Sequence, residues 1–288
     1  MRISPDIIDY IDNELDEISG WLPPEAAYFT AYLLSYQKEI NMTGNILEIG
    51  VFHGKYLSLL YLFSGEKETV HGIDAFLNGT DKRALANRVF DNIACFCGKR
   101  APTNRVFDNI ACFCGKRGAP TYRVFNNIAR FCGNNDRLKI IAKNSLNITP
   151  DDLRDKETSD FRFISVDGGH TSDIVYHDLC LAKSVIKDGG IIALDDAFNH
   201  TTPGVNEGMH RFMLSDNKDG YLAAFAHCYN KAFFTTSKHH KEYLQLAYDF
   251  LEEMRHLPAC QRTKQRIDEN RNNGFVPEMY GREIVGFL

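Results

Sequence analysis

The stretch ILEIGVFHGKYLSLL, from Ile46 to Leu60, decides the fold of this chain. It opens with a short apolar run that suits a buried strand, and Glu48, Gly50 and Gly54 then lead into a helical pattern. Glycine lets the backbone turn sharply and approach a ligand at a helix N-terminus. The segment lacks the third glycine of a dinucleotide fingerprint, and Tyr56 stands where a P-loop needs Ser or Thr. It therefore predicts a strand, a binding turn and a helix, although a purely structural turn would also explain the two glycines.

The rest of the chain extends this unit into a sheet. From Asn45 onward, short apolar runs alternate with helical stretches, a pattern typical of βαβ units. Strands are predicted at Ile46–Ile49, Val70–Ala75, Leu138–Ala142, Phe161–Val166 and Ile191–Leu194. Two more apolar segments, Tyr221–Cys228 and Ala232–Thr236, are separated by Tyr-Asn-Lys and predict a hairpin. The expected fold class is α/β, with a doubly wound, mostly parallel sheet and an antiparallel edge hairpin.

Helical patterns flank this sheet. They are expected at Pro5–Ile18, Pro24–Gln37 and Glu242–Arg255. The clearest helix follows Thr171 and ends at Gly189 and Gly190; its apolar stripe comprises Ile174, Val175, Leu179, Ala182, Val185 and Ile186, and its polar face comprises Asp173, His177, Asp178, Lys183 and Lys187. The predicted division is a helical cap at 1–44, a core at 45–238, and a C-terminal helix and tail at 239–288.

A tandem repeat interrupts the core at about 87–133. NRVFDNIACFCGKR occurs unchanged at Asn87–Arg100 and Asn104–Arg117, and a looser copy runs from Tyr122 to Gly133. The units are too short for a solenoid, so we interpret them as an expanded surface insertion, the alternative being a dedicated binding module. Five of the eight cysteines lie in these copies as C-x-C pairs or singly, without the spacing of a zinc site. They are expected to be free thiols.

Composition limits the partners. Acidic residues outnumber basic ones by 38 to 33, so no strong positive field is available to attract nucleic acid. The first twenty residues lack the pattern of a secretory signal, and no apolar run is long enough to span a membrane. The chain is expected to be cytoplasmic, with a small molecule as partner and with a homo-oligomer left open.

A second binding signal follows the second predicted strand. Asp74, in HGIDAF, stands at the carboxyl end of that strand. An acid at this place in a doubly wound sheet can accept hydrogen bonds from a ribose. A helix cap or turn would also use an aspartate here. Because the glycine turn and this acid occur in the expected order, the two together favour a nucleoside-containing ligand.

Three carboxylates and a histidine follow the next strands. Asp167 ends one predicted strand, and Asp195 and Asp196 end another, so the three should converge above adjacent strand ends. Converging like charges call for a cation or for hydrogen-bond donors, and Mg²⁺ takes oxygen ligands of this type. A structural role in ending the strand is the alternative. His170, on the loop after Asp167, could remove a proton from an alcohol.

These residues carry a resemblance to class I S-adenosylmethionine-dependent methyltransferases, covering about Asn45 to Thr236. The resemblance implies a Rossmann-like sheet and S-adenosylmethionine as the cofactor. It places Glu48 under the methionine end, Gly50 and Gly54 along the cofactor, and Asp74 on the ribose hydroxyls. The remaining residues that it assigns to the cofactor site are Asn144 and Ser145, near the adenine, and Asp167.

The segment from Ile164 to Asn199 resembles metal-dependent sugar O-methyltransferases of the macrocin and mycinamicin type through D-G-G-H, K-D-G-G and L-D-D. That resemblance implies Asp167, Asp195 and Asp196 as Mg²⁺ ligands, His170 as general base, and Pro203–Gly208 as a loop over the acceptor. The expected activity is O-methylation of a sugar, polyol or phenol. The alternatives are a metal-independent N- or carboxyl-methyltransferase and a non-catalytic cofactor-binding protein.

Overall fold

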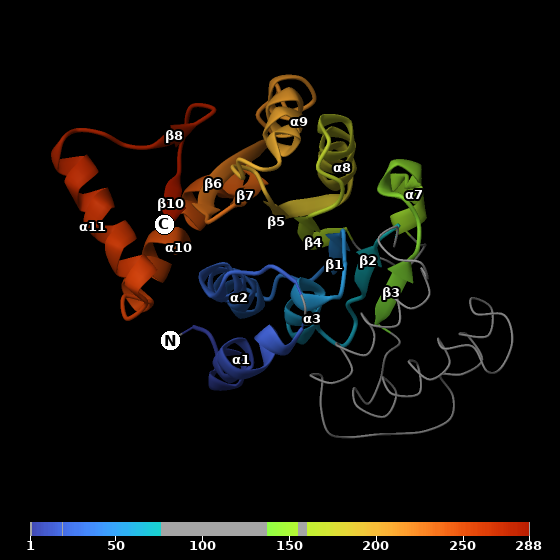
Figure 1. Ribbon diagram of the computed structural model, residues 1–288, viewed down its shortest axis with the longest axis horizontal. Helices are drawn as coiled ribbons and strands as arrows, with labels where there is room; N and C mark the ends of the chain where they lie inside the picture. The colour runs from blue at the N-terminus through green and yellow to red at the C-terminus, as the bar shows by residue number, and fades with distance from the viewer. Residues whose placement is uncertain (1, 19, 76–136, 155–159, 288) are drawn as a thin grey trace, which may run out of the picture.

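An eight-stranded sheet forms the centre of the protein in the computed structural model, which describes residues 2–18, 20–75, 137–154 and 160–287 (Figure 1). The strand order is β10-β6-β7-β5-β4-β1-β2-β3. The strands are β1 (Asn45–Ile49), β2 (Val70–Ile73), β3 (Leu138–Ile141), β4 (Phe161–Val166), β5 (Ile186–Leu194), β6 (Leu222–Cys228), β7 (Lys231–Thr236) and β10 (Val285–Phe287). β1 to β5 pair in parallel, and β7 is antiparallel to both β5 and β6. The predicted fold class is confirmed.

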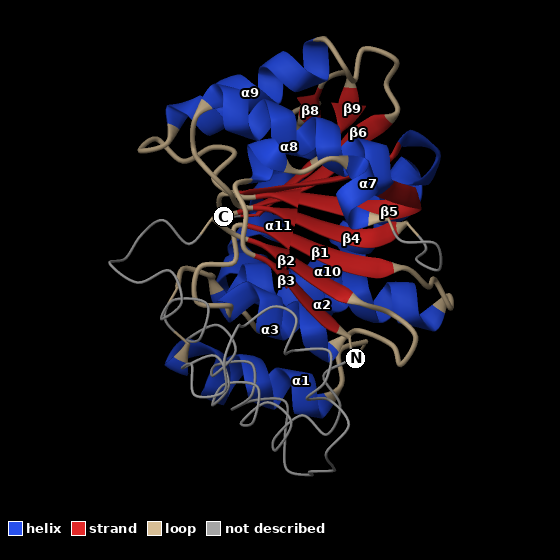
Figure 2. Ribbon diagram, turned by 90° about the vertical axis from the view of Figure 1, so that its right-hand side faces the viewer, coloured by secondary structure: helices blue, strands red, loops and turns tan. Residues whose placement is uncertain are grey.

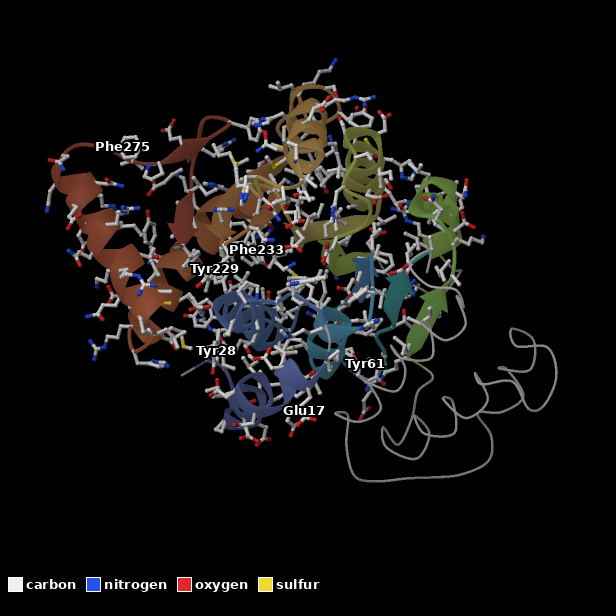
Figure 3. All side chains as sticks on the ribbon, in the orientation of Figure 1. Glu17, Tyr28, Tyr61, Tyr229, Phe233 and Phe275 are labelled. Atoms are coloured by element: carbon white, nitrogen blue, oxygen red, sulfur yellow. The ribbon has the colours of Figure 1, made fainter. Side chains whose placement is uncertain are left out.

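Helices cover both faces of this sheet (Figure 2). One face carries α2 (Pro24–Glu39), α3 (Lys55–Leu62) and α10 (His240–Glu253); the other carries α7 (Pro150–Leu153), α8 (Ser172–Val185) and α9 (Pro203–Leu214). Neighbouring residues of one strand therefore enter different cores: Ile46 joins the α2 side and Leu47 the α8 side. Phe233 of β7, labelled in Figure 3, meets Phe29 of α2 edge to face, with ring centres 5.0 Å apart. All five residues of β1 are buried, as expected for a covered parallel strand.

The helix boundaries differ most from the prediction in two places, whereas α2 and α10 differ by no more than two residues at either end. The first helix is broken into α1 (Pro5–Asp9), a π-helical turn at Tyr10–Glu14 and a 3₁₀ turn at Leu15–Glu17. α8 ends at Val185, and β5 begins at the next residue, because Ile186 already pairs with Phe161 of β4. Gly189 (φ +79°) therefore lies within the strand, where the β4–β5 register shifts, rather than ending the helix.

The C-terminal region contains more structure than the expected helix and tail. α10 is followed by α11 (Pro258–Asn272), by the short pair β8 (Glu278–Met279) and β9 (Arg282–Glu283), and by β10. β10 pairs in parallel with β6 and so lies outside the hairpin in the sheet. The domain division stays a prediction, and residues from both flanks, including Phe29 and Phe250, join one core cluster.

Several sequence features lie elsewhere than expected or beyond the described part of the chain. Pro203–Gly208, expected as a loop, forms the first turns of α9. The repeat at 87–133 lies outside the described residues. Cys180, Cys228 and Cys260, in the described part, are free thiols. None of the described helices is both long and apolar enough to cross a membrane.

Candidate active site

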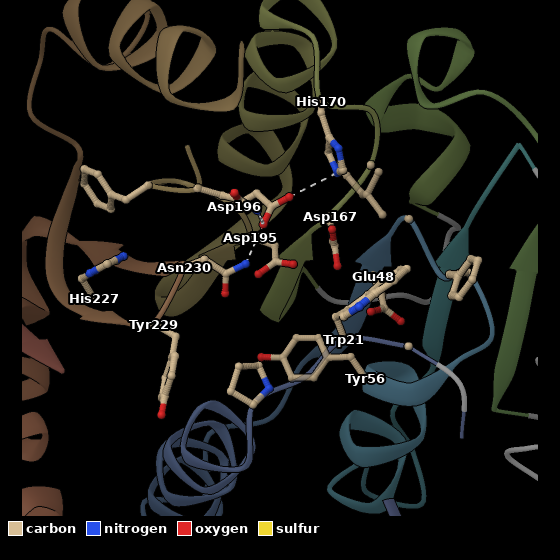
Figure 4. A pocket seen from close by; sticks show the side chains of 18 of the residues that line it. Trp21, Glu48, Tyr56, Asp167, His170, Asp195, Asp196, His227, Tyr229 and Asn230 are labelled. Atoms are coloured by element: carbon tan, nitrogen blue, oxygen red, sulfur yellow. Dashed lines mark hydrogen bonds and ion pairs between the residues drawn. The ribbon is translucent and has the colours of Figure 1, made fainter. Parts of the chain in front are cut away.

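A cavity of about 1640 Å³ lies at the carboxyl ends of β1, β2, β4 and β5 (Figure 4). Ligand pockets commonly measure roughly 300–1,000 Å³, so this one has room for two substrates. It brings together nearly all the predicted site residues: Glu48, Gly50, Asp74, Asn144, Ser145, Asp167, His170, Asp195 and Asp196. Gly54 does not line the cavity and instead begins α3 as its N-cap.

The turn after β1 requires its glycines. Gly50 has φ +88°, and a Cβ there would lie 1.7 Å from the carbonyl oxygen of Asp167, at the end of β4. Gly54 has φ +82°. Both backbone conformations are costly for residues with a side chain. The turn after β1 therefore lies directly against the end of β4, and only glycine permits that contact.

Asp74 ties the same turn to the end of β2. Its Oδ2 accepts a hydrogen bond of 2.8 Å from the Phe52 backbone N–H, which fixes the loop between β1 and α3. Asp74 also lines the cavity. This is the position in a doubly wound sheet where an acid meets a ribose.

The loop after β3 contacts a buried acid of α8, Asp178. Asn144 Oδ1 accepts from the Leu146 backbone N–H (3.0 Å), so this side chain caps a 3₁₀ turn, Ser145–Asn147. Asp178 of α8 is 1% exposed; burial raises its pKa, and its interactions with the Ser145 hydroxyl and a neighbouring histidine oppose that rise. Sequence reasoning placed Asp178 on the polar face of the helix and so missed this supporting role.

Three carboxylates, Glu48, Asp167 and Asp195, line one end of the cavity, and a buried lysine lies behind them. Burial raises the pKa of Glu48 and of Asp167 well above the usual range, and the nearby Asp195 adds to both shifts. Asp195 differs: burial acts to raise its pKa, but the Lys231 ammonium, 2.9 Å from Oδ1, outweighs it and lowers the pKa. Lys231 was predicted to lie in the hairpin turn, whereas it is the first residue of β7 and is 1% exposed.

Asp196 and His170 form a second group, nearer to solvent. Asp196 has φ +57°, a strained conformation, and its Oδ1 accepts hydrogen bonds from the side-chain amides of Asn199 (2.9 Å) and Asn230 (2.5 Å). Its Oδ2 lies 3.5 Å from Nε2 of His170, whose side chain is 49% exposed (Figure 4). The amides hold the carboxylate so that it can orient the imidazole. No spacing signal in the sequence indicated Asn230.

The predicted divalent cation can be tested against this arrangement. Carboxylates are suitable ligands in kind. However, Asp195 faces Lys231, and Asp196 is engaged by two amides and by His170. Within the described ranges, no group of three or more His, Cys, Asp or Glu side chains lies close enough to hold a metal ion. The side chains as arranged do not fit a three-carboxylate metal site.

Aromatic residues line the outer part of the cavity and were not singled out from the sequence. Trp21, 87% exposed, stacks on Phe52 with ring centres 5.9 Å apart, and Phe52 stacks on His53 at 3.9 Å. Across the cavity, Phe198 meets His227 edge to face at 4.5 Å. Such surfaces offer apolar contact to a bound ring system.

A family model and several solved structures are similar to this chain. A family model described as a methyltransferase domain matches residues 47–197. No curated protein sequence matches the chain. Among solved structures, similarity is found to CalS11, a TDP-rhamnose 3′-O-methyltransferase of calicheamicin biosynthesis, with 17% identity, 81% of this chain and 87% of that chain covered, and a TM-score of 0.48.

Two further solved structures are similar at the same distant level. An O-methyltransferase from Bacillus cereus in complex with SAH shares 14% identity, with 80% and 90% of the two chains covered and a TM-score of 0.48. MycE, a methyltransferase of the mycinamycin pathway in complex with Mg, SAH and mycinamycin VI, shares 14% identity, with 81% and 55% covered and a TM-score of 0.44. Similarity at this level does not transfer a substrate.

Proposed function

Because this chain belongs to the methyltransferase domain family and is an S-adenosylmethionine-dependent methyltransferase, we propose that it methylates a hydroxyl group of a small molecule. In the proposed complex the cofactor lies over the turn after β1, with Glu48 and Gly50 beside its methionine portion and Asp74 at its ribose. Asn144 and Ser145 lie toward its adenine. Asp167 stands between this region and His170.

The observation that carries the proposal is the position of His170 in the cavity. Its imidazole shares the cavity with Glu48, Gly50 and Asp74 and is oriented by Asp196, which two amides hold in place. A histidine with an acid behind it can take a proton from a hydroxyl and stabilise the resulting imidazolium. N-methylation of a neutral amine or methylation of a carboxylate has less need of such a base.

The proposed reaction is an in-line displacement at the methyl carbon. The acceptor oxygen forms a bond to that carbon as the carbon–sulfur bond breaks. The electron pair of the broken bond stays on sulfur, giving S-adenosylhomocysteine. The acceptor proton passes to His170, whose positive charge Asp196 stabilises. Holding both substrates in near-attack geometry supplies much of the rate enhancement. The aromatic residues Trp21 and Phe198 would contact the acceptor's rings.

The predicted metal ion is not part of this mechanism. A Mg²⁺ ion at Asp167, Asp195 and Asp196 would hold and acidify the acceptor hydroxyl, but because these side chains do not fit such a site, no step above passes through a metal. A cytosolic location and a homo-oligomer rest on sequence reasoning alone.

Isotope transfer tests the proposal. The protein is incubated with S-adenosylmethionine carrying a labelled methyl group and with a panel of sugars, polyols and phenols, and products are identified by mass spectrometry. We expect an alkali-stable labelled ether. Carboxylic acids and amines are included in the panel, and a labelled ester or amine as the sole product would contradict methylation of a hydroxyl. His170→Ala is assayed alongside the parent, with His256→Ala, at an exposed position away from the cavity, as the matched control.

A further inference from the structure

A buried ammonium group lies among the carboxylates of the cavity. Lys231 Nζ is 2.9 Å from Asp195 Oδ1 and 4.6 Å from the centre of the Tyr56 ring. The side chain is 1% exposed, and the Tyr56 hydroxyl is itself held by Thr30 at 2.7 Å. An ion pair together with a cation–π contact stabilises a charge that burial alone would disfavour. The ammonium is therefore fixed behind the cavity wall, against Asp195, and does not face solvent.

The charge of Lys231 acts on more than its direct partner. Its pKa is raised despite burial, because Asp195 and Asp167 favour the charged form. In turn, it lowers the pKa of Asp167 and of Glu48, against the larger effect of their burial. One fixed positive charge thus serves three carboxylates that would otherwise repel one another.

This arrangement performs the electrostatic task expected of a metal ion. A divalent cation would have to displace the ammonium from Asp195 or share that carboxylate with it. At contact distance in a buried site, repulsion between the two cations is severe. The backbone of Lys231 is fixed at the start of β7, because the next residue, Ala232, is paired with Leu194 of β5.

We propose that Lys231 is the resident cation of this carboxylate cluster, taking the place of a divalent metal and positioning Asp195 for the reaction. The inference rests on the proposed function, because the cluster borders the same cofactor and acceptor sites. Lys231 is a positioning residue: it holds Asp195, which lines the cavity. Methyl transfer accordingly proceeds without a divalent cation.

Mn²⁺ binding tests this directly. Free Mn²⁺ is measured by electron paramagnetic resonance in the S-adenosylhomocysteine complexes of the parent, Lys231→Met, and Lys183→Met. Lys183, on α8 and away from the cavity, is the matched control. It also pairs with an aspartate, Asp219, whose side chain is 61% exposed. The parent and the control should bind no Mn²⁺ up to about 1 mM, the weak end of biological cation sites.

Lys231→Met should gain one Mn²⁺ site, tighter than that limit by about tenfold or more, and the second change Asp195→Asn should remove it. The proposal is overturned if the parent binds one Mn²⁺ that Asp195→Asn abolishes, or if folded Lys231→Met gains no site. If Lys231→Met shows no cooperative unfolding, and so is not folded, the comparison of Mn²⁺ binding by the parent and by Asp195→Asn decides the question. The isotope-transfer assay on the same samples separates these results from a failure of the proposed function, which would yield no labelled ether and leave Mn²⁺ binding unchanged.

Discussion

Replacing Gly50 with alanine should damage both folding and cofactor binding, because two independent costs meet at this position. The first is conformational: at φ +88° a residue with a Cβ costs about 1–2 kcal/mol more than glycine. The second is steric, since the new Cβ would lie 1.7 Å from the Asp167 carbonyl oxygen, and real Cβ contacts are essentially never under 3.0 Å. The end of β4 must therefore move by about 1 Å or more.

Overpacking of this kind adds about 1–3 kcal/mol, so Gly50→Ala should lower the free energy of unfolding by about 2–5 kcal/mol. Gly220→Ala separates the two costs, because Gly220 has φ +67° and no atom within 4 Å of the added Cβ. The control should lose about 1–2 kcal/mol only. Urea unfolding gives the stabilities, and calorimetry with S-adenosylhomocysteine gives the affinities.

The movement of Asp167 should also appear in function. A displacement of about 1 Å in a catalytic site can cost roughly 10²-fold in rate, so residual Gly50→Ala activity should be reduced by that order. Gly220→Ala should keep the parent's affinity and rate. If Gly50→Ala were as stable as Gly220→Ala and bound S-adenosylhomocysteine like the parent, the contact between the turn after β1 and the end of β4 would not exist as described.

Three other outcomes follow from the same structure. His170→Ala should lower turnover by about 10²- to 10⁴-fold while cofactor affinity stays unchanged, and a parent-like rate would remove His170 as the base. Arg162→Met should lower the free energy of unfolding in urea by about 3–5 kcal/mol, because it removes the partner that donates two hydrogen bonds of 2.9 Å to the buried Glu68 carboxylate. Arg154→Met, at an exposed ion pair with Asp160, is the control and should cost less than about 1 kcal/mol. Burial raises the pKa of Glu68, but the hydrogen bonds and the charge of Arg162 outweigh it and lower that pKa below its ordinary value of 4.5. The stability that this ion pair contributes is therefore present above pH 4.5 and is lost as the pH falls through the lower, folded-state pKa. In acid unfolding, Glu68→Gln should not show this loss of stability.

The sheet was predictable because its signals are local. Parallel strands covered on both faces appear as short apolar runs, and the runs at β1, β4 and β7 were placed within a residue or two. Gly50 and Asp74 were identified because each follows such a run, and strand ends in this fold meet at one edge. Residues assigned in this way lie together in one cavity.

The features that could not be predicted from the sequence depend on contacts between distant segments or lie in short or polar elements. Lys231 looked like a turn residue, and only its position opposite Asp195 makes it a buried cation. Asp178 fits the polar face of α8, but the loops after β3 and β4 cover this one residue of that face. α11 lacks an apolar stripe, with Ala259, Cys260 and Thr263 as its buried residues, and β10 is only three residues long. Short or polar elements of this kind give little periodic signal.

Calorimetric titration with S-adenosylhomocysteine tests the central claim most directly, because it needs no acceptor. The parent should bind one equivalent per chain, and Asp74→Ala should bind more weakly, since it removes both the proposed ribose contact and the bond to Phe52 that shapes the turn. Asp151→Ala, at an exposed aspartate outside the cavity, should bind like the parent. No heat of binding by the parent, or equal affinity in the parent and Asp74→Ala, would contradict the cofactor site described above.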